Sequence, residues 1–138
     1  MIFVENFVKI LKKNKVDFFT GVPDSILKNL SLYLENFSIK KHIIAANEGA
    51  AVSVGIGYYL SRKKIPCVYF QNSGLGNAIN PLISIAHKEV YSIPLLLIIG
   101  WRGSPNQPDE PQHKAKGKIT KNLLQLLKVK HCVLKSEK

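Results

Sequence analysis

The 138-residue sequence has little of what marks secreted and membrane proteins. Its only two cysteines, Cys67 and Cys132, lie far apart in apolar surroundings, and we interpret both as reduced core thiols, not as a disulfide. No apolar run reaches the roughly 18 residues of a membrane-spanning helix, and the longest, Ile93–Gly100, has the length of a strand. The first residues, Met1–Lys15, lack the apolar core of a signal peptide. We therefore expect one soluble domain in the cytoplasm, with no membrane as a partner.

Arginine is also scarce. The chain carries 20 lysines and arginines against nine acidic residues, a formal net charge of +11, yet only Arg62 and Arg102 are arginines. The lysines are scattered, as at Lys12-Lys13, whereas proteins that read nucleic acids favour clustered arginines interleaved with aromatic side chains. The charge pattern predicts a solvated surface and no nucleic-acid partner, and it is compatible with anionic substrates.

Apolar patterning divides the chain into helices that alternate with short β-rich runs. Helices are predicted over Phe3–Lys13, from a cap at Asp24 or Ser25 to Leu34, and over Asn47–Ser61, Gly74–Ala86 and Ile119–Leu127. Strands are predicted over Val16–Thr20, Lys41–Ala46, Ile65–Gln71, Ile93–Gly100 and His131–Leu134. Because this alternation is typical of parallel sheets covered on both sides, the predicted fold class is α/β, a three-layer parallel sheet with helices on both faces.

Proline and glycine add three local expectations. Trp101–Lys118 is polar and contains prolines, so we predict a loop there, and Pro81 should interrupt the helix around it. Gly55 and Gly57 each cost about 1 kcal/mol against alanine inside a helix. Glycines tolerated at that cost suggest that another backbone approaches closely.

The polar and glycine-rich segments follow the predicted strands. In parallel sheets, ligands bind at the carboxyl ends of the strands, where four such segments would meet. They are Gly21–Ser25, Asn47–Gly49, Gln71–Asn77 and Gly100–His113. We therefore predict a ligand site at this edge of the sheet.

Glu48 is the most informative residue of these segments. The apolar run Ile43–Ala46 delivers this lone carboxylate to the start of a helix of small residues. A buried acid is costly unless it is paired or protonated, so its presence there indicates acid–base chemistry or activation of a cofactor. The alternative is an exposed acid that the helix dipole favours in the first turn.

Other readings of these segments stay open on sequence alone. Gly21–Asp24 is also compatible with a simple capped turn. Gln71–Gly76 matches the first two glycines of the dinucleotide fingerprint, but Ile79 stands at the third glycine position, which weakens a nicotinamide site. The run Asp109–His113 has two acids and a histidine around a proline and fits no strong metal spacing, so we predict no metal ligands in this chain.

Together, the segments resemble the pyrimidine-binding domain of thiamine diphosphate-dependent 2-oxoacid decarboxylases, in particular the phosphonopyruvate decarboxylases and the related α subunits of sulfopyruvate decarboxylases. The matching stretches are collinear and cover most of the chain: Gly21–Ser25, Ala45–Gly49, Gln71–Asn77, Asn80–Leu82, Tyr91–Pro94, Gly100–Gly103 and Asp109–His113. The last stretch favours phosphonopyruvate, a substrate of phosphonate biosynthesis, over sulfopyruvate. The resemblance implies that 1–138 is one pyrimidine-binding domain.

The resemblance also implies roles for residues. The equivalent of Glu48 hydrogen-bonds N1′ of the cofactor's aminopyrimidine, which prepares the cofactor to attack the 2-oxo carbon of the substrate. His113 would be a second catalytic residue on an active-site loop. The positions that would pass near the cofactor are Asn72, Ser73, Gly74 and Leu75. Those expected near the substrate are Asp24 and Ser25, together with Arg102, whose planar guanidinium suits a phosphonate or carboxylate.

One part of the family pattern is missing. A complete enzyme of this kind binds the diphosphate through Mg²⁺ in a second domain marked by Gly-Asp-Gly, and this sequence contains no Gly-Asp-Gly. We expect the diphosphate-binding domain to act in trans, the chain alone to be inactive, and the chain to form a homo-oligomer. The competing hypothesis is a non-catalytic interaction module that keeps the fold.

Overall fold

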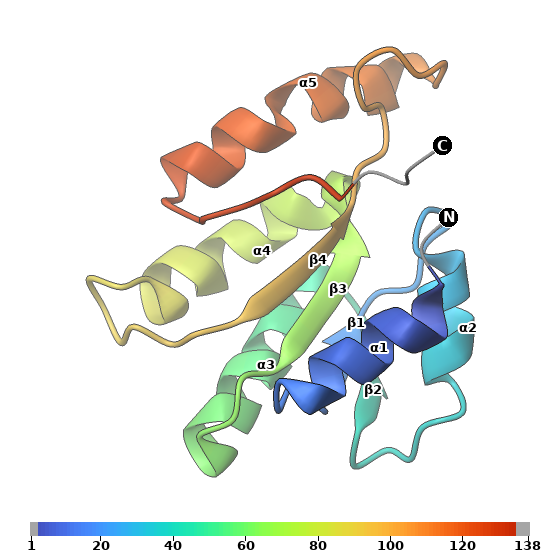
Figure 1. Ribbon diagram of the computed structural model, residues 1–138. Helices are drawn as coiled ribbons and strands as arrows, with labels where there is room; N and C mark the ends of the chain where they lie inside the picture. Colours follow the sequence, from blue (N-terminus) through green and yellow to red (C-terminus); the bar gives the residue numbers. More distant parts are fainter. Residues whose placement is uncertain (1–2, 135–138) are drawn as a thin grey trace.

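Four short apolar strands form the centre of the fold. They are β1 (Phe19–Gly21), β2 (His42–Ile44), β3 (Cys67–Gln71) and β4 (Leu96–Gly100), all parallel, in the order β2-β1-β3-β4. Phe19 pairs with His42 on one side and with Cys67 on the other, and Cys67 pairs with Leu96. This computed structural model describes residues 3–134 (Figure 1).

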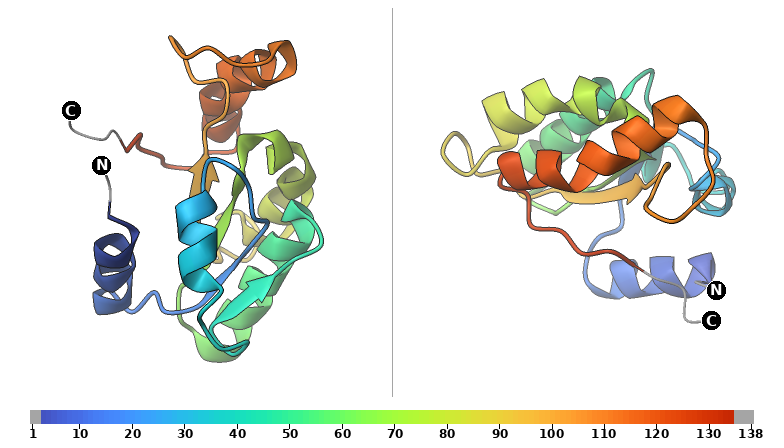
Figure 2. Two further views of the ribbon diagram at one scale, coloured as in Figure 1. Left: turned by 90° about the vertical axis from the view of Figure 1, so that its right-hand side faces the viewer. Right: turned by 90° about the horizontal axis from the view of Figure 1, so that it is seen from above.

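Helices cover both faces of the sheet (Figure 2). One layer contains α1 (Val4–Lys13) and α2 (Lys28–Leu34). The opposite layer contains α3 (Glu48–Arg62), α4 (Leu75–Pro81), the π-helix η2 (Leu82–Ala86) and α5 (Pro111–Leu126), while the 3₁₀ turn η1 (Asn72–Gly74) joins β3 to α4. The predicted α/β fold with three layers is therefore confirmed.

Each helical layer has its own apolar core. On the first face, Val8 of α1 and Leu34 of α2 pack with Phe19 and Tyr69 of the sheet. On the second face, Val52 of α3 and Ala78 of α4 pack with Val68 and Phe70, and Leu124 of α5 belongs to the same cluster. The alternation of side chains along β3 serves both cores, so this central strand is buried along most of its length.

The predicted loop over Trp101–Lys118 is wrong in its second half, because α5 begins at Pro111. Proline is well tolerated at the first helical position, where its missing N–H has no intrahelical partner. Gly117, which weakens a helix by its propensity, lies where α5 meets the backbone of Gly103. A tertiary contact thus extends the helix into a stretch that local pattern assigns to a loop.

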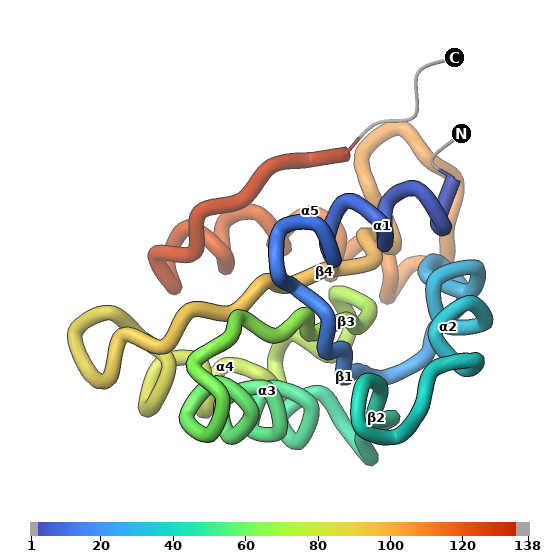
Figure 3. Tube along the Cα trace, turned by 60° about the horizontal axis from the view of Figure 1, so that its bottom comes forward, coloured from blue at the N-terminus to red at the C-terminus, as the bar shows by residue number. Residues whose placement is uncertain are grey.

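The predicted strand over His131–Leu134 is also wrong. Lys128 takes a left-handed conformation with φ 55° at the end of α5, and the residues that follow are irregular. In Figure 3 this red segment lies outside the sheet. Cys132 is consequently exposed, which corrects its placement in the core, whereas Cys67 is buried and burial raises the pKa of its thiol. Both cysteines are free.

The expectations for the two helical glycines are wrong, and the one for Pro81 is confirmed. A Cβ at Gly55 would lie 2.9 Å from the Cγ2 of Val68, so a side chain, not another backbone, approaches this glycine. A Cβ at Gly57 would have no neighbour within 4 Å, and the expectation of a close backbone is wrong there too. Pro81 ends α4 as predicted, and the helix continues as η2 with π geometry. Within residues 3–134, no helix combines the length and apolar character needed to cross a membrane.

Candidate functional site

The carboxyl edge of the sheet contains a topological switch point. β1 and β3 are neighbours, yet the chain leaves β1 towards α2 on one face and leaves β3 towards α4 on the other (Figure 1). Such a divergence opens a crevice where ligands bind in open parallel sheets. Gly21 ends β1 so close to β3 that a Cβ there would overlap the carbonyl oxygen and ring of Tyr69. The sheet therefore requires a glycine beside the crevice.

Glu48 lies at this edge, as the first residue of α3. Asn47 caps the helix, since its Oδ1 accepts a hydrogen bond of 2.9 Å from the Ala50 N–H. The Glu48 side chain is half-buried, not enclosed, and its Oε2 accepts a hydrogen bond of 2.9 Å from Asn77 Nδ2. The predicted helix-start carboxylate thus reaches across from α3 to α4.

Gly74 provides the space that the Glu48 side chain occupies. A Cβ at Gly74 would overlap the carboxyl carbon and Oε1 of Glu48. Among the described residues, Oε1 accepts no hydrogen bond, so one oxygen of the carboxylate is held by Asn77 and the other lies free over Gly74. Glu48 and Gly74, predicted as site residues, are thus brought into contact.

Asn72 is placed differently from the prediction of a cofactor contact. Its side chain is buried, and its Nδ2 donates to the Arg102 carbonyl and to Thr120 Oγ1, both at 2.9 Å. Its Oδ1 accepts from the Arg102 N–H at 3.1 Å. These three hydrogen bonds of the Asn72 side chain join the end of β3 to the end of β4 and to α5.

Two further predicted cofactor contacts are engaged within the protein. Ser73 Oγ accepts a short hydrogen bond of 2.6 Å from Gln71 Nε2. Leu75, the first residue of α4, has its side chain buried in the core, so only its backbone is available for a contact with a ligand. Of the four predicted cofactor contacts, Gly74 is the one that touches the candidate catalytic acid.

Arg102 forms a bridge between two loops. Its Nε donates to both carboxylate oxygens of Asp109, at 3.0 and 3.2 Å, and its Nη1 donates to Ser25 Oγ at 3.1 Å. The Arg102 hydrogen bond, supported by the backbone N–H groups of Glu110 and Gly103, lowers the pKa of Asp109 to about 2. Arg102 and Ser25, both predicted substrate contacts, therefore lie together, with the guanidinium charge balanced by Asp109.

A cavity of about 480 Å³ opens beside this bridge. Its lining residues come from the loops that follow β1 and β4: Ser25, Ile26, Trp101, Arg102, Gly103, Ser104, Gln107, Pro108 and Asp109. A volume of this size accommodates a small organic acid.

Asp24 and His113 flank this region with incomplete hydrogen bonding. Asp24 Oδ1 caps the turn before α2 by accepting from the Ile26 and Leu27 N–H groups, at 2.7 and 3.1 Å. Its Oδ2 and His113 Nδ1 are buried and have no partner among the described residues. A buried polar atom without a partner is costly, so such atoms occur where a ligand or water completes the bonding. Thr20 Oγ1, in the middle of β1, is also buried without a partner among the described residues.

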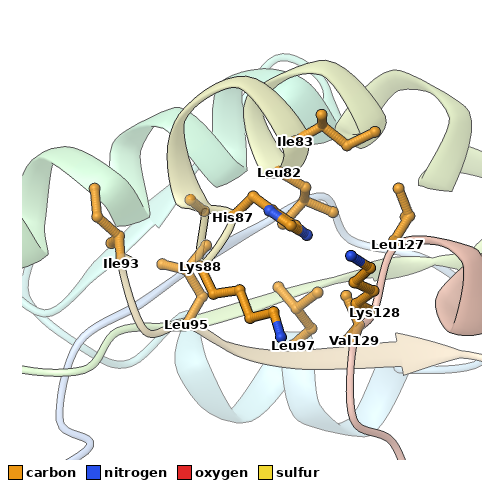
Figure 4. Close-up of a pocket in the computed structure, with 11 residues that line it drawn as sticks. Leu82, Ile83, His87, Lys88, Ile93, Leu95, Leu97, Leu127, Lys128 and Val129 are labelled. Carbon is orange, nitrogen blue, oxygen red and sulfur yellow. The ribbon is translucent and has the colours of Figure 1, made fainter. Parts of the chain in front are cut away.

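A second cavity lies at the opposite end of β4, away from these residues (Figure 4). It measures about 160 Å³ and is mainly apolar, and the basic side chains His87, Lys88 and Lys128 border it. It contains none of the predicted site residues. We therefore place the functional site at the carboxyl edge.

Sequence reasoning assigned no role to two residues that organise the site. Asn77 holds Glu48, and Asp109 holds Arg102. Both belong to motif stretches singled out from the sequence, but their partners lie 29 and 7 residues away. The run Asp109–His113 forms no metal cluster, and residues 3–134 contain no group of three or more His, Cys, Asp or Glu side chains placed to hold a metal ion.

Fold and site together define a parallel α/β domain whose ligand site is built from the loops at the strand ends. Comparison with protein families matches residues 1–126 to the family described as thiamine pyrophosphate enzyme, N-terminal TPP binding domain. The chain belongs to this family.

Two curated relatives indicate which enzymes of the family the chain is similar to. The chain is 41% identical over 106 residues to phosphonopyruvate decarboxylase of Streptomyces viridochromogenes, which covers 77% of this chain and 26% of the relative. It is 36% identical over 125 residues to sulfopyruvate decarboxylase subunit alpha of Methanococcus maripaludis, which covers 91% of this chain and 72% of that subunit. The chain thus spans about a quarter of the first relative and most of the second.

A solved structure supports the fold. Benzoylformate decarboxylase from Polynucleobacter necessarius superposes with a TM-score of 0.61 at 24% identity, over 78% of this chain and 20% of that one. At this identity the match supports the fold alone, that is, the arrangement of strands and helices.

Proposed function

We propose that this chain is the pyrimidine-binding half of a thiamine diphosphate-dependent 2-oxoacid decarboxylase. The observation that carries the proposal is the Glu48 carboxylate at the carboxyl edge of the sheet, with Oε2 held by Asn77 and Oε1 free over Gly74. The thiamine pyrophosphate enzyme family of the chain, and relatives that are named as decarboxylases, support the same reaction.

The residues present fit an aminopyrimidine. Among the described residues Glu48 Oε1 accepts no hydrogen bond, so it is available to a flat ring with a nitrogen in its edge. When bound, thiamine diphosphate supplies the electron sink for loss of CO₂. Glu48 would hydrogen-bond the ring nitrogen and control its protonation. Pairing with a second domain would exclude water from this site, and the hydrogen bond would be stronger in the lower dielectric.

The loops on the other side of the crevice would handle the substrate. His113 would hold or move a proton through its ring, since its buried Nδ1 lacks a partner in the described part of the chain. Asp24 and Ser25 would border the 2-oxoacid, and of the two Ser25 lines the cavity. Arg102 would meet the anionic end of the substrate with the N–H groups that Asp109 and Ser25 leave available.

For the substrate we propose phosphonopyruvate, which the more similar relative is named for. The alternative is sulfopyruvate, because the chain spans 72% of a subunit named for that acid. Both substrates join a 2-oxoacid to a strongly acidic tetrahedral group, so the same site chemistry serves either one.

A complete active site would need a diphosphate-binding domain or subunit that also binds Mg²⁺. This requirement follows from the resemblance and from the lack of Gly-Asp-Gly in the sequence. We therefore propose that the chain is inactive by itself and that the active enzyme is an oligomer. We propose the cytoplasm as its location.

The test is reconstitution. The chain is mixed with the diphosphate-binding subunit from the same genome, thiamine diphosphate and Mg²⁺, and aldehyde formation is assayed from phosphonopyruvate and from sulfopyruvate. We expect turnover of one acid by the mixture and none by the chain alone. A mixture that associates without producing an aldehyde would support the interaction module, and robust turnover by the purified chain would refute the need for a partner.

Glu48→Gln provides the decisive variant. Glutamine keeps the shape of the side chain but cannot take up or release the proton, so we expect turnover to fall by at least about 100-fold. The matched control is Glu5→Gln, which changes an exposed acid on α1 that pairs with Lys9. Near-normal turnover by the Glu48 variant would remove the assigned role.

A further inference from the structure

We infer that Asn77 is a positioning residue that orients the Glu48 carboxylate. This inference rests on the proposed function of Glu48 and adds a residue that determines how the acid presents its free oxygen. The two side chains come from different helices, α3 and α4, and meet through the 2.9 Å hydrogen bond from Asn77 Nδ2 to Glu48 Oε2.

The Glu48 side chain needs such a restraint. A glutamate side chain loses rotamer entropy when it is held in one conformation. At the start of α3, the Asn47 cap fixes the backbone but not the carboxylate. Gly74, against which the carboxyl group packs, has no side chain that could hydrogen-bond it. In the described part of the chain, Asn77 donates the one side-chain hydrogen bond that the carboxylate accepts.

The backbone of Asn77 is fixed against α3, while its side chain is exposed. A Cβ at Gly49 would lie 2.8 Å from the Asn77 carbonyl oxygen, so the backbone of Asn77 packs directly against the first turn of α3. The donor and the acceptor therefore belong to segments in direct contact. A hydrogen bond to a charged acceptor is stronger than one between neutral groups, which suits a single bond that must set an orientation.

The chemistry of an amide suits this position. Asn77 is neutral, so it restrains the acid without adding a second proton-exchanging group. Its amide N–H occupies Oε2 and leaves Oε1 for the ring nitrogen of the cofactor. Without it, the carboxylate would rotate, and part of the time its free oxygen would point away from the ring.

The first experiment uses the 138-residue chain alone. The side-chain amide resonances of Asn77 and Asn80 are recorded by NMR in the wild type and in Glu48→Ala. Asn80 lies on the same helix, and its Oδ1 accepts from Ser84 Oγ, so it is the internal control. In the variant we expect the chemical shifts of the Asn77 amide protons to change and those of Asn80 to remain the same. Unchanged Asn77 resonances would overturn the inference, whatever the enzyme does.

The second experiment uses the reconstituted complex and measures how fast the thiazolium C2 proton of thiamine diphosphate exchanges with deuterium. Loss of a hydrogen bond to a charged group predicts exchange about tenfold slower in Asn77→Ala, against a change within about twofold in Asn80→Ala. Asn77→Gln, which keeps the amide, should recover part of the rate. Cofactor affinity, measured by calorimetry, separates this effect from simple loss of binding.

The two proposals fail in different ways. If Glu48→Gln exchanges as fast as the wild type, the function proposed for Glu48 fails. If Glu48→Gln is slow and Asn77→Ala is as fast as the wild type, the positioning role alone fails. If Asn77→Ala does not fold, the NMR comparison on the Glu48 variant decides the question.

Discussion

Individual side chains at the carboxyl edge are held by partners within the chain. Arg102 illustrates the effect, because both oxygens of Asp109 accept from its Nε. With the pKa of Asp109 lowered to about 2, this pair persists at any pH near neutrality. A substrate anion would therefore meet a guanidinium whose charge is already compensated, and binding there would require a share of its remaining N–H groups.

His42 gives the residue-scale prediction. Its ring is buried in β2 and lies 2.8 Å from the hydroxyl of Tyr69, and burial lowers its pKa below the usual 6.5 against weaker opposing effects that include the charge of Glu35. Below pH 6.5 the unfolded chain takes up a proton at His42 that the folded chain does not. Stability should therefore fall with acidification, by at most about 1.4 kcal/mol per pH unit from this group.

The measurement is urea unfolding at pH 7.5 and 5.5. His42→Gln keeps a polar group near Tyr69 but cannot titrate, so it should lose less stability on acidification than the wild type. His131→Gln, at an exposed position, serves as the control. Equal pH dependence in the wild type and in His42→Gln would contradict the prediction.

At the scale of elements, α5 depends on a close backbone contact. A Cβ at Gly117 would overlap the carbonyl oxygen of Gly103, and a Cβ at Gly103, where φ is +67°, would overlap the His113 carbonyl. Trp101 Nε1 also donates to the Gly117 carbonyl at 3.0 Å. These contacts dock the first half of α5, and His113 with it, on the loop after β4.

Gly117→Ala tests this docking, and Gly57→Ala is its comparison at a helical glycine without close neighbours. Alanine favours a helix by about 1 kcal/mol over glycine, so Gly57→Ala, which meets no atom within 4 Å, should raise the free energy of unfolding by roughly 0.5–1 kcal/mol. Gly117→Ala should lower it, since the overlap with Gly103 outweighs the gain in propensity. Chemical denaturation checks both, and stabilisation by Gly117→Ala would show that α5 is not docked as described.

At the scale of the whole molecule, exposed apolar surface and net charge have opposite effects on the association of the chain. Large apolar side chains are exposed on several elements: Phe3, Ile10, Ile26, Leu32, Ile39, Ile44, Leu60, Ile83, Tyr91, Ile119, Leu126 and Leu134. Within residues 3–134, β4 adds an outer edge that pairs with no strand, and most of its side chains are half-buried. Such surfaces favour association, whereas a net charge of +11 opposes it.

We predict a homo-oligomer whose formation increases with salt. Salt screens the repulsion between like-charged chains and leaves apolar contacts in place. Sedimentation equilibrium over a range of concentrations, at low and moderate ionic strength, is the measurement. A monomer at every concentration and in both buffers would contradict the prediction.

Local patterns in the sequence determined the alternation of helices and strands, the edge of the sheet where polar loops gather, and the position of Glu48 at the start of α3. These features follow from hydrophobic periodicity and from capping by neighbours such as Asn47, which act over a few residues. The interruption at Pro81 belongs to the same class, because the lost N–H acts within one helical turn.

Only the tertiary structure decided which partners the site residues have. The Asn77–Glu48 bond joins residues 29 apart, and Asn72 bonds to Arg102 and Thr120, 30 and 48 residues away. The docking of the first half of α5 likewise depends on a contact with another segment, the loop after β4. Periodicity reports which face of an element is apolar, but a hydrogen bond between distant segments depends on how those elements pack, which no local pattern of residues encodes.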